Sequence, residues 1–209
     1  MANVPDPTVF VIDDERTVRE SIRWLVESVG LNVETFASAR EFIDSHDRAR
    51  PGCIVLDLRM PAMGGVEAQE TFRAREINLP VIVITGYADV STAVRVLKQG
   101  AVDFIQKPFS DQLLLDRIHE CIERDAEERR NHAARAEVSA RLASLSPRED
   151  EVLRMVVAGD ANKTVARKLG ISPKTVEVHR ANLMRKTQAK SLAELVQMVL
   201  ASETHRGNP

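Results

Sequence analysis

Side chains that bind phosphate and metal ions recur at the ends of short apolar segments. Asp13 and Asp14 follow the first segment, Asp57 ends the third, Thr85 ends the fourth, and Lys107 follows the fifth. Three carboxylates in one crevice disfavour one another's ionisation unless a cation is present, and oxygen ligands of this kind suit Mg²⁺. A lysine ammonium and a threonine hydroxyl can bind phosphoryl oxygens. The pattern predicts phosphoryl transfer to a carboxylate.

The elements that would position these side chains are five β-branched runs, each followed by a stretch of helical periodicity. Continuous apolar runs suit strands that are covered on both faces, so we expect an α/β doubly wound, flavodoxin-like sheet of five parallel strands. Ligands bind such sheets outside the carboxyl ends of the strands, where the polar residues fall. The predicted strands are Thr8–Ile12, Val33–Phe36, Cys53–Leu56, Val81–Thr85 and Asp103–Ile105.

Helix boundary signals fit the same alternation. Ser38 and Glu41 have the spacing of a capping box, and Asp89 can begin the helix after the fourth strand. Gly30 and Gly100 stand where left-handed residues end helices.

Each polar residue alone has an ordinary explanation as a turn residue, a helix cap or a strand end, so the argument depends on the ordered set. Two enzyme classes fit poorly. Magnesium-dependent phosphatases with an aspartyl nucleophile usually place an acid two residues later, where this chain has Arg59. A dinucleotide-binding loop is glycine-rich, whereas this first turn is Asp13-Asp14-Glu15. We expect no enzyme acting on outside substrates.

Residues 8–124 resemble the receiver domain of two-component response regulators. The motifs that carry the resemblance are Val11-Ile-Asp-Asp-Glu15, Val55-Leu-Asp-Leu-Arg-Met-Pro-Ala-Met-Gly-Gly65, Ile84-Thr-Gly86 and Phe104-Ile-Gln-Lys-Pro-Phe109. The resemblance implies that Asp57 is the phosphoacceptor and that Asp14 is a Mg²⁺ ligand. It also implies that Asp13 reaches the metal directly or through water, and that the metal contacts Asp57 and the backbone carbonyl of Arg59.

The same resemblance implies a switch. Thr85 would bind the phosphoryl group and move inward, the Phe104 ring would follow it, and Lys107 would pair with Asp57 or its phosphate. The peptide before Pro108 would be cis. The chain departs from the pattern of close relatives after the fourth strand, where Gly86-Tyr-Ala-Asp89 replaces Gly-His-Gly-Asp.

The formal net charge of −2 conceals two halves of opposite sign, −7 for residues 1–140 and +5 for residues 141–209. A basic C-terminal part of this size favours a module that binds a polyanion. Residues 123–137 lack large apolar side chains and predict a solvated helix with charge pairs such as Asp125–Arg129. Alanines at 126, 133 and 140 are seven residues apart, so a coiled-coil seam is the alternative interpretation of this segment. We therefore expect domains at 1–124 and 145–209 and a helical linker at 125–144.

Four short helices are expected in the basic part, with capping boxes at Ser146–Glu149 and Ser191–Glu194. Lys163–Lys186 has the helix, glycine turn, helix pattern of a helix-turn-helix, and residues 173–187 would form the helix that enters the DNA major groove.

A helical wheel of the second helix places Val176, His179 and Leu183 inward. The residues turned outward would read base edges, and they are Lys174, Glu177, Val178, Ala181 and Arg185. Flanking residues suit phosphates, and they are Lys163, Thr175, Arg180, Asn182 and Lys186. A solvated surface is the alternative explanation for each charge.

Residues 145–201 resemble LuxR/NarL-type effector domains, and Ile171–Asn182 with Ala189–Leu192 is similar to FixJ-type regulators. The resemblance implies a transcriptional regulator that a sensor histidine kinase phosphorylates and that binds promoter DNA as a homodimer, with RNA polymerase as a further partner. The alternative is a phosphorylation-independent DNA-binding regulator that uses the receiver only for docking or dimerisation. The apolar stripe of the last helix, from Leu192 to Val199, suits either dimer contact or internal packing.

The remaining sequence features predict that the protein is located in a reducing cytoplasm. Cys53 and Cys121 are far apart in sequence and lack neighbours at metal-ligand spacing. No apolar run approaches the length of a membrane span, and the first residues lack the pattern of a signal peptide.

Overall fold

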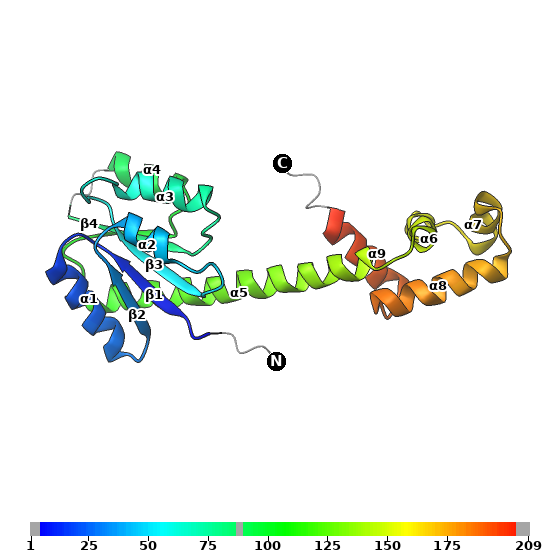
Figure 1. Ribbon diagram of the computed structural model, residues 1–209, viewed down its shortest axis with the longest axis horizontal. Coiled ribbons are helices and arrows are strands. Elements are labelled where there is room, and N and C mark those ends of the chain that lie inside the picture. Colours follow the sequence, from blue (N-terminus) through cyan, green and yellow to red (C-terminus); the bar gives the residue numbers. More distant parts are fainter. Residues whose placement is uncertain (1–4, 87–89, 204–209) are drawn as a thin grey trace. The chain divides into compact units, whose positions relative to one another are not determined.

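The computed structural model describes residues 5–86 and 90–203, and it divides into an N-terminal unit, Met1–Arg129, and a C-terminal unit, Arg130–Pro209. The N-terminal unit contains one parallel sheet in the order β2-β1-β3-β4-β5, as the doubly wound fold requires. Figure 1 labels its elements. The strands are β1 (Thr8–Ile12), β2 (Asn32–Phe36), β3 (Gly52–Asp57), β4 (Val81–Thr85) and β5 (Asp103–Gln106).

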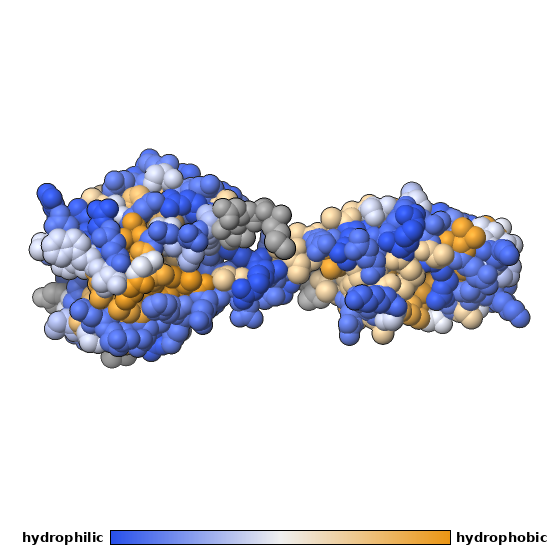
Figure 2. Space-filling view, turned by 90° about the horizontal axis from the view of Figure 1, so that it is seen from below, coloured by the Kyte–Doolittle hydropathy of each residue, from blue (hydrophilic) through white to orange (hydrophobic). Residues whose placement is uncertain are grey.

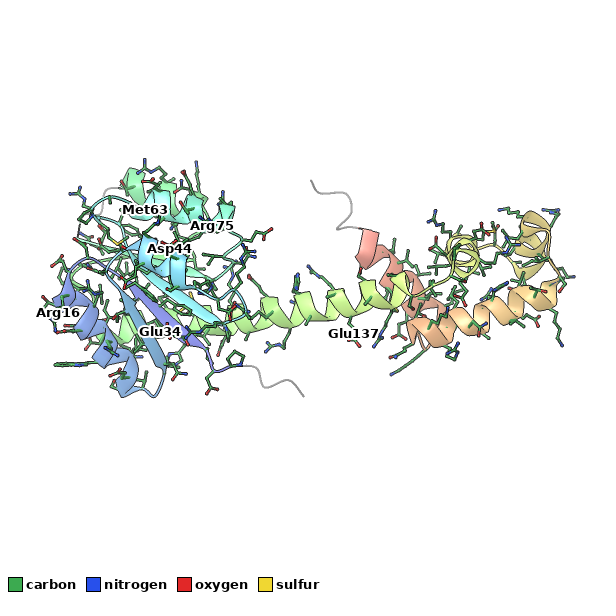
Figure 3. The ribbon with its side chains drawn as sticks, in the orientation of Figure 1. Arg16, Glu34, Asp44, Met63, Arg75 and Glu137 are labelled. Atoms are coloured by element: carbon green, nitrogen blue, oxygen red, sulfur yellow. The ribbon has the colours of Figure 1, made fainter. Side chains whose placement is uncertain are left out.

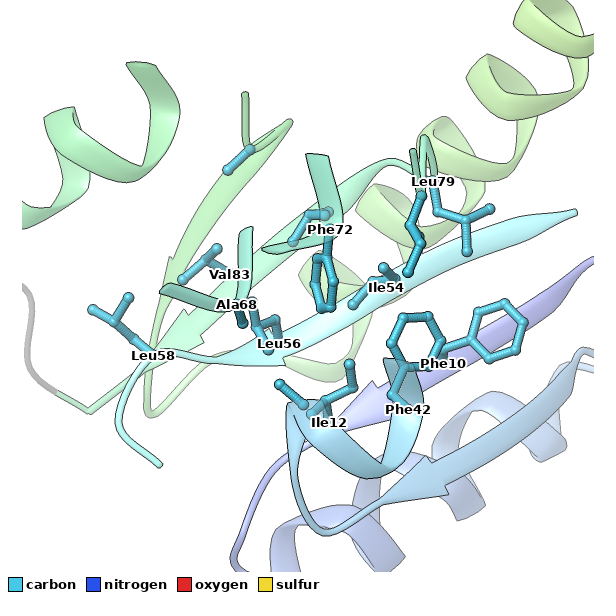
Figure 4. Packing of buried hydrophobic residues seen from close by; sticks show 14 of the residues in the cluster. Phe10, Ile12, Phe42, Ile54, Leu56, Leu58, Ala68, Phe72, Leu79 and Val83 are labelled. Atoms are coloured by element: carbon cyan, nitrogen blue, oxygen red, sulfur yellow. The ribbon is translucent and has the colours of Figure 1, made fainter. Parts of the chain in front are cut away.

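Helices cover both faces of this sheet. Three helices pack on one face, and they are α2 (Ala39–Ser45), α3 (Gly65–Ala74) and α4 (Val90–Lys98). The other face packs against α1 (Arg16–Ser28) and the first part of α5 (Asp111–Ala143). Figure 4 shows the first core, where the rings of Phe10 and Phe42 lie 5.4 Å apart and Phe72 packs edge-on against Phe42. β1, β3 and β4 are buried along their whole length, and their residues are apolar except at the strand ends, where Thr8, Asp57 and Thr85 stand.

The predicted strands are confirmed with small shifts at their ends. β2 begins one residue earlier than predicted, β3 extends at both ends to include Gly52 and Asp57, and β5 extends to Gln106. Ser38 caps α2 by accepting from the amide of Glu41, and Gly30 and Gly100 have φ of 77° and 99°. The prediction for Asp89 lies outside the described residues.

The C-terminal unit is helical and has two small cores. Its helices are α6 (Pro147–Val157), α7 (Asn162–Leu169), α8 (Pro173–Thr187) and α9 (Leu192–Glu203). One core joins α6, α7 and α8, and the other joins α6, α8 and α9 to Val138 and Leu142 at the end of α5. The capping box at Ser146 is present in full. No helix among the described residues is long and apolar enough to cross a membrane.

The expectation of a solvated helix after Ile122 is wrong for its first part. The Asp125–Arg129 pair exists, with 2.8 Å between Oδ2 and Nε, but Asp125 is only 4% exposed and packs in the N-terminal unit. Sequence periodicity missed this contact because its partner is backbone from a distant loop. On the face seen in Figure 2, the surface of the N-terminal unit is largely hydrophilic and carries one band of hydrophobic residues.

Candidate functional site

Two carboxylates and one ammonium meet at the carboxyl end of the sheet. The Nζ atom of Lys107 lies 2.8 Å from Oδ2 of Asp13 and 3.0 Å from Oδ1 of Asp57. Asp13 is fully buried and Asp57 is 5% exposed. Parallel pairing of β1 with β3 and of β3 with β4 brings these strand ends to one edge, although 50 residues separate Asp57 from Lys107.

Backbone amides hold the other oxygens of both carboxylates. The amide of Arg59 donates to Oδ2 of Asp57 at 2.7 Å, and the amide of Glu15 donates to Oδ1 of Asp13 at 2.8 Å. The amide of Lys107 donates to the carbonyl of Thr85, and the peptide before Pro108 is cis. Each acidic side chain is thus fixed in direction before any ligand binds.

The site is electrostatically strained at one carboxylate. Burial raises the pKa of Asp57, and the hydrogen bond from Lys107 only partly offsets this effect. Burial alone would lower the pKa of Lys107, but hydrogen bonds to Asp13 and Asp57 raise it. A charged ammonium therefore faces a carboxylate whose ionised form is disfavoured by burial, and a second cation at this point would favour that ionised form.

The structure brings together only part of the predicted metal set. Asp14 is exposed, and among the described residues no three acidic, His or Cys side chains are grouped as a metal site requires. The three carboxylates are thus not grouped in the structure, and the role of Asp14 as a metal ligand stays a prediction. The donors nevertheless fit Mg²⁺, which binds through one or two carboxylates and keeps several waters. Asp13 and Asp57 supply carboxylate oxygens. The predicted backbone ligand, the carbonyl of Arg59, follows Asp57 by two residues.

The two predicted switch residues lie beside the site. Thr85 is fully buried at the end of β4, next to Lys107 in backbone pairing. Phe104 is half-buried on β5 and packs against the core formed with α2, α3 and α4.

Sequence reasoning missed Arg19. Its Nη1 atom donates to the backbone carbonyl of Asp13 at 2.6 Å, so this guanidinium supports the peptide between the two neighbouring acids. Only its position one turn into α1 could have indicated this, and that spacing resembles an ordinary surface charge.

The C-terminal unit presents α8 as predicted. Val176 and Leu183 are buried and His179 is half-buried, so the inward face of the wheel is confirmed in outline. All five predicted reading residues are exposed, and they are Lys174, Glu177, Val178, Ala181 and Arg185. Val178 is 53% exposed, so its methyl groups are accessible on this face.

The flanking residues divide into two groups. Lys163 and Thr175 are exposed, and Asn182 is half-buried. In contrast, Arg180 donates to Oδ1 of Asn162, and Lys186 donates to Oε2 of Glu149 at 2.7 Å. These two cations are therefore engaged within the unit.

Two further cations were not predicted as DNA contacts. Arg167 on α7 and Lys190 after α8 are exposed, and within the described part of the chain neither the Arg167 guanidinium nor the Lys190 ammonium pairs with a carboxylate, although the Lys190 amide donates to Glu194. Arg167 lies one helical turn after Lys163, a spacing that could have indicated it.

The Glu149–Lys186 pair predicts a specific acid sensitivity. Hydrogen bonds from Lys186 and the Ser146 backbone lower the pKa of Glu149 from 4.5 to about 2. A lowered acid pKa contributes stability above the unfolded value that is lost as pH falls through the folded value. Glu149→Gln should therefore lower the free energy of unfolding by about 2 kcal/mol at pH 7 and remove this loss between pH 4.5 and about 2.

Circular dichroism of unfolding across this pH range measures the effect. Glu151→Gln is the matched control, because Glu151 pairs with Arg148 on the same helix at 2.7 Å but is 52% exposed. Its cost should stay below about 1 kcal/mol. Equal costs for the two variants would contradict the assigned role of Glu149.

Two family models match the chain. Residues 9–119 match the response regulator receiver domain, and residues 143–199 match bacterial regulatory proteins of the luxR family. The chain therefore belongs to the two-component response regulators that combine a receiver domain with a LuxR-type DNA-binding domain. This family consists of transcriptional regulators and not of enzymes.

The chain is similar over nearly its whole length to FixJ proteins. The transcriptional regulatory protein FixJ of Azorhizobium caulinodans is 49% identical, over 92% of this chain and 91% of that protein. FixJ of Rhizobium meliloti is 46% identical, over 94% and 96%. The solved structure of the response regulator StyR is 42% identical with a TM-score of 0.86 and covers 94% of this chain and 99% of its own. The chain is thus of the FixJ type.

Proposed function

We propose that the chain is a transcriptional regulator that accepts a phosphoryl group on Asp57 from a sensor histidine kinase and then binds promoter DNA as a homodimer. The observation that carries this proposal is the Lys107 ammonium shared between Asp57 and Asp13. A half-buried cation beside a buried carboxylate suits a site that must take up further negative charge.

In the transfer step, a carboxylate oxygen of Asp57 attacks phosphorus and the bond from phosphorus to the donor's imidazole nitrogen breaks. The electron pair of that bond returns to the imidazole. Lys107 keeps its proton and faces the incoming oxygens, while the amide of Arg59 holds the second carboxylate oxygen of Asp57 in place.

Asp13, Asp14, Asp57 and the backbone carbonyl of Arg59 would hold Mg²⁺. The ion supplies charge neutralisation for the phosphoryl oxygens and for the carboxylates around them. Asp13 accepts from the Glu15 amide with Oδ1 and from Lys107 with Oδ2, so both of its oxygens are held in place within the site. The exposed Asp14 side chain would have to turn inward to reach the ion.

The change then passes to the surface formed by α4 and β5. Thr85 would move toward the phosphoryl group, and Phe104 would fill the space that it leaves. Val94 and Leu97 of α4 are each 44% exposed, and we propose that they contact a second copy of the chain after phosphorylation. Phosphorylation can shift the equilibrium between the resting and the dimer-forming conformation only by the difference in free energy with which it stabilises the two.

The kinase would dock beside the site. A groove of about 340 Å³ begins next to Lys107 and runs along α1, lined by Thr17, Val18, Ser21, Ile22, Leu25, Pro108, Phe109 and Asp111. Trp24 lies one turn beyond Ser21 and is 72% exposed. An apolar groove with an exposed tryptophan suits a partner helix that carries the phosphohistidine.

For DNA, we propose that α8 enters the major groove. Lys174, Glu177, Val178, Ala181 and Arg185 would read base edges. Phosphate contacts would come from the remaining predicted residues, Lys163, Thr175, Arg180, Asn182 and Lys186, with the last requiring release from Glu149. A dimer would present two such helices to half-sites, with RNA polymerase as the next partner. The regulator would act in the cytoplasm, where it meets the chromosome.

The direct test of phosphoryl acceptance is incubation with acetyl phosphate and Mg²⁺, followed by intact mass measurement. We expect a gain of one phosphoryl group in the wild-type chain. No gain, or a gain that survives in Asp57→Asn, would refute the proposal.

The reading face is tested by Glu177→Ala. A carboxylate that accepts from a cytosine amino group discriminates by about 1–3 kcal/mol at one base pair, so this variant should lose preference at that position. Selection from a randomised DNA pool measures the preference. Lys163→Ala is the control, since it should weaken all sequences alike and lower the salt slope by about one. Unchanged preference in Glu177→Ala would contradict the assigned face.

A further inference from the structure

Two charged residues tie α5 to a loop at the opposite end of the sheet from Asp57. Asp125 is 4% exposed, and its Oδ2 atom accepts from the amide of Gly52 at 2.9 Å and from Nε of Arg129 at 2.8 Å. Its Oδ1 atom also accepts from Nε of Arg129, at 3.0 Å. Burial of a carboxylate costs free energy unless the charge is paired and hydrogen-bonded, as the Asp125 carboxylate is here.

Arg129 extends the contact to the loop before β3. Its Nη2 atom donates to the carbonyl of Arg50 at 2.7 Å, and its Nη1 atom to that of Ala49 at 3.2 Å. One guanidinium therefore satisfies loop carbonyls while Asp125 satisfies the following amide. Five residues of loop and strand, 48–52, are held by two side chains of one helix.

A neighbouring pair shows that spacing alone does not explain this. Arg124 and Glu128 are also four residues apart on α5 and also paired, at 2.9 Å, but their side chains are 57% and 52% exposed. Within the described residues each of these two side chains hydrogen-bonds only to the other, and such exposed pairs contribute little. The same sequence pattern thus gives one surface pair and one tertiary attachment.

The attachment stands at the beginning of an unsupported stretch of helix. Residues 130–137 of α5 are all exposed, and Glu137 is labelled among them in Figure 3. The next side chain of α5 that packs against a core is Val138 in the C-terminal unit. Eight exposed residues without an apolar face are too few to form a stable helix alone in water, because helices shorter than about 12–15 residues are marginal.

We propose that Asp125 and Arg129 form a latch that keeps the bridging segment 130–137 helical and thereby carries the phosphorylation signal out of the receiver. This inference rests on the proposed function above. The latch fixes the last turn of α5 inside the receiver, and that turn serves as the nucleus from which the bridging helix continues. Without it the bridge becomes a flexible tether, and a change in the receiver no longer biases the DNA-binding unit.

The test compares Arg129→Met with Arg124→Met in the full chain. Arg129→Met removes the contacts to the loop and keeps the length of the side chain, which is 34% exposed. Hydrogen exchange should rise about tenfold in peptides from residues 123–137, and stay unchanged in Arg124→Met. The increase in promoter affinity after treatment with acetyl phosphate should fall to less than half of the wild-type value in Arg129→Met only, with the mass gain unchanged.

Unchanged exchange in Arg129→Met would overturn the latch, and so would lost protection with an undiminished increase in affinity. Asp125→Asn provides a second variant, since it keeps an oxygen for the Gly52 amide and removes the charge that Arg129 requires. If the wild-type chain itself gains no affinity for the promoter on phosphorylation, the proposed function is refuted. Hydrogen exchange of residues 123–137 in Arg129→Met still decides whether the latch exists.

Discussion

Asp57→Asn is expected to abolish phosphorylation by acetyl phosphate, because the amide cannot act as the nucleophile. The same change should raise the free energy of unfolding of the metal-free protein at pH 7. Burial raises the pKa of the Asp57 carboxyl, so the folded state carries an unfavourable charge above that pKa. This penalty disappears as pH falls below the folded pKa toward the ordinary value of 3.8.

The two readouts are intact mass and the unfolding transition followed by fluorescence of Trp24, the one tryptophan of the chain. Asp44→Asn is the matched control, since Asp44 lies exposed on α2 and pairs with Arg40 at 3.2 Å. It should keep phosphorylation and leave stability within about 0.5 kcal/mol. A lower stability of Asp57→Asn at pH 7 would contradict the electrostatic account of the site.

Gly52→Ala is expected to have the largest effect on folding. Gly52 begins β3 with a φ of 146°, and a Cβ atom there would overlap the backbone carbonyl oxygen of Thr8 on β1. Neither backbone can move without breaking the central pairing of β1 with β3. We expect a loss of more than about 3 kcal/mol in the unfolding free energy of the N-terminal unit, a large part of a typical domain's stability.

Gly30→Ala separates strain from overlap. Gly30 has a φ of 77°, but a Cβ atom there would meet nothing within 4 Å. Its cost should be about 1 kcal/mol, from backbone conformation alone. Denaturant unfolding followed by Trp24 fluorescence measures both variants. Similar losses of unfolding free energy in Gly52→Ala and Gly30→Ala would contradict the predicted clash with Thr8.

Much of the receiver could be predicted because its signals are local. Apolar runs fixed the strands to within one or two residues, and Ser38, Gly30 and Gly100 marked helix ends through their own conformational preferences. The positions of Asp13, Asp57 and Lys107 at strand ends followed from the parallel order. In the C-terminal unit, the wheel of α8 followed from helical periodicity and the buried Val176 and Leu183.

The features that sequence reasoning missed depend on backbone partners far along the chain. Nothing local distinguishes Asp125–Arg129 from Arg124–Glu128, because the loop carbonyls that Arg129 contacts lie about eighty positions away. Nothing local predicts the pairing of Lys186 with Glu149, which lie 37 positions apart in the chain. Arg19 acts on a carbonyl, which has no sequence signature.

The central claim is that phosphorylation of Asp57 controls DNA binding by a separate unit. The most direct measurement is the equilibrium affinity of the full chain for a promoter fragment before and after treatment with acetyl phosphate and Mg²⁺, with Asp57→Asn in parallel. We expect the affinity for the promoter fragment to increase about 5- to 150-fold in the wild-type chain and not to change in Asp57→Asn. Equal affinity in both states, with the mass gain present, would contradict it.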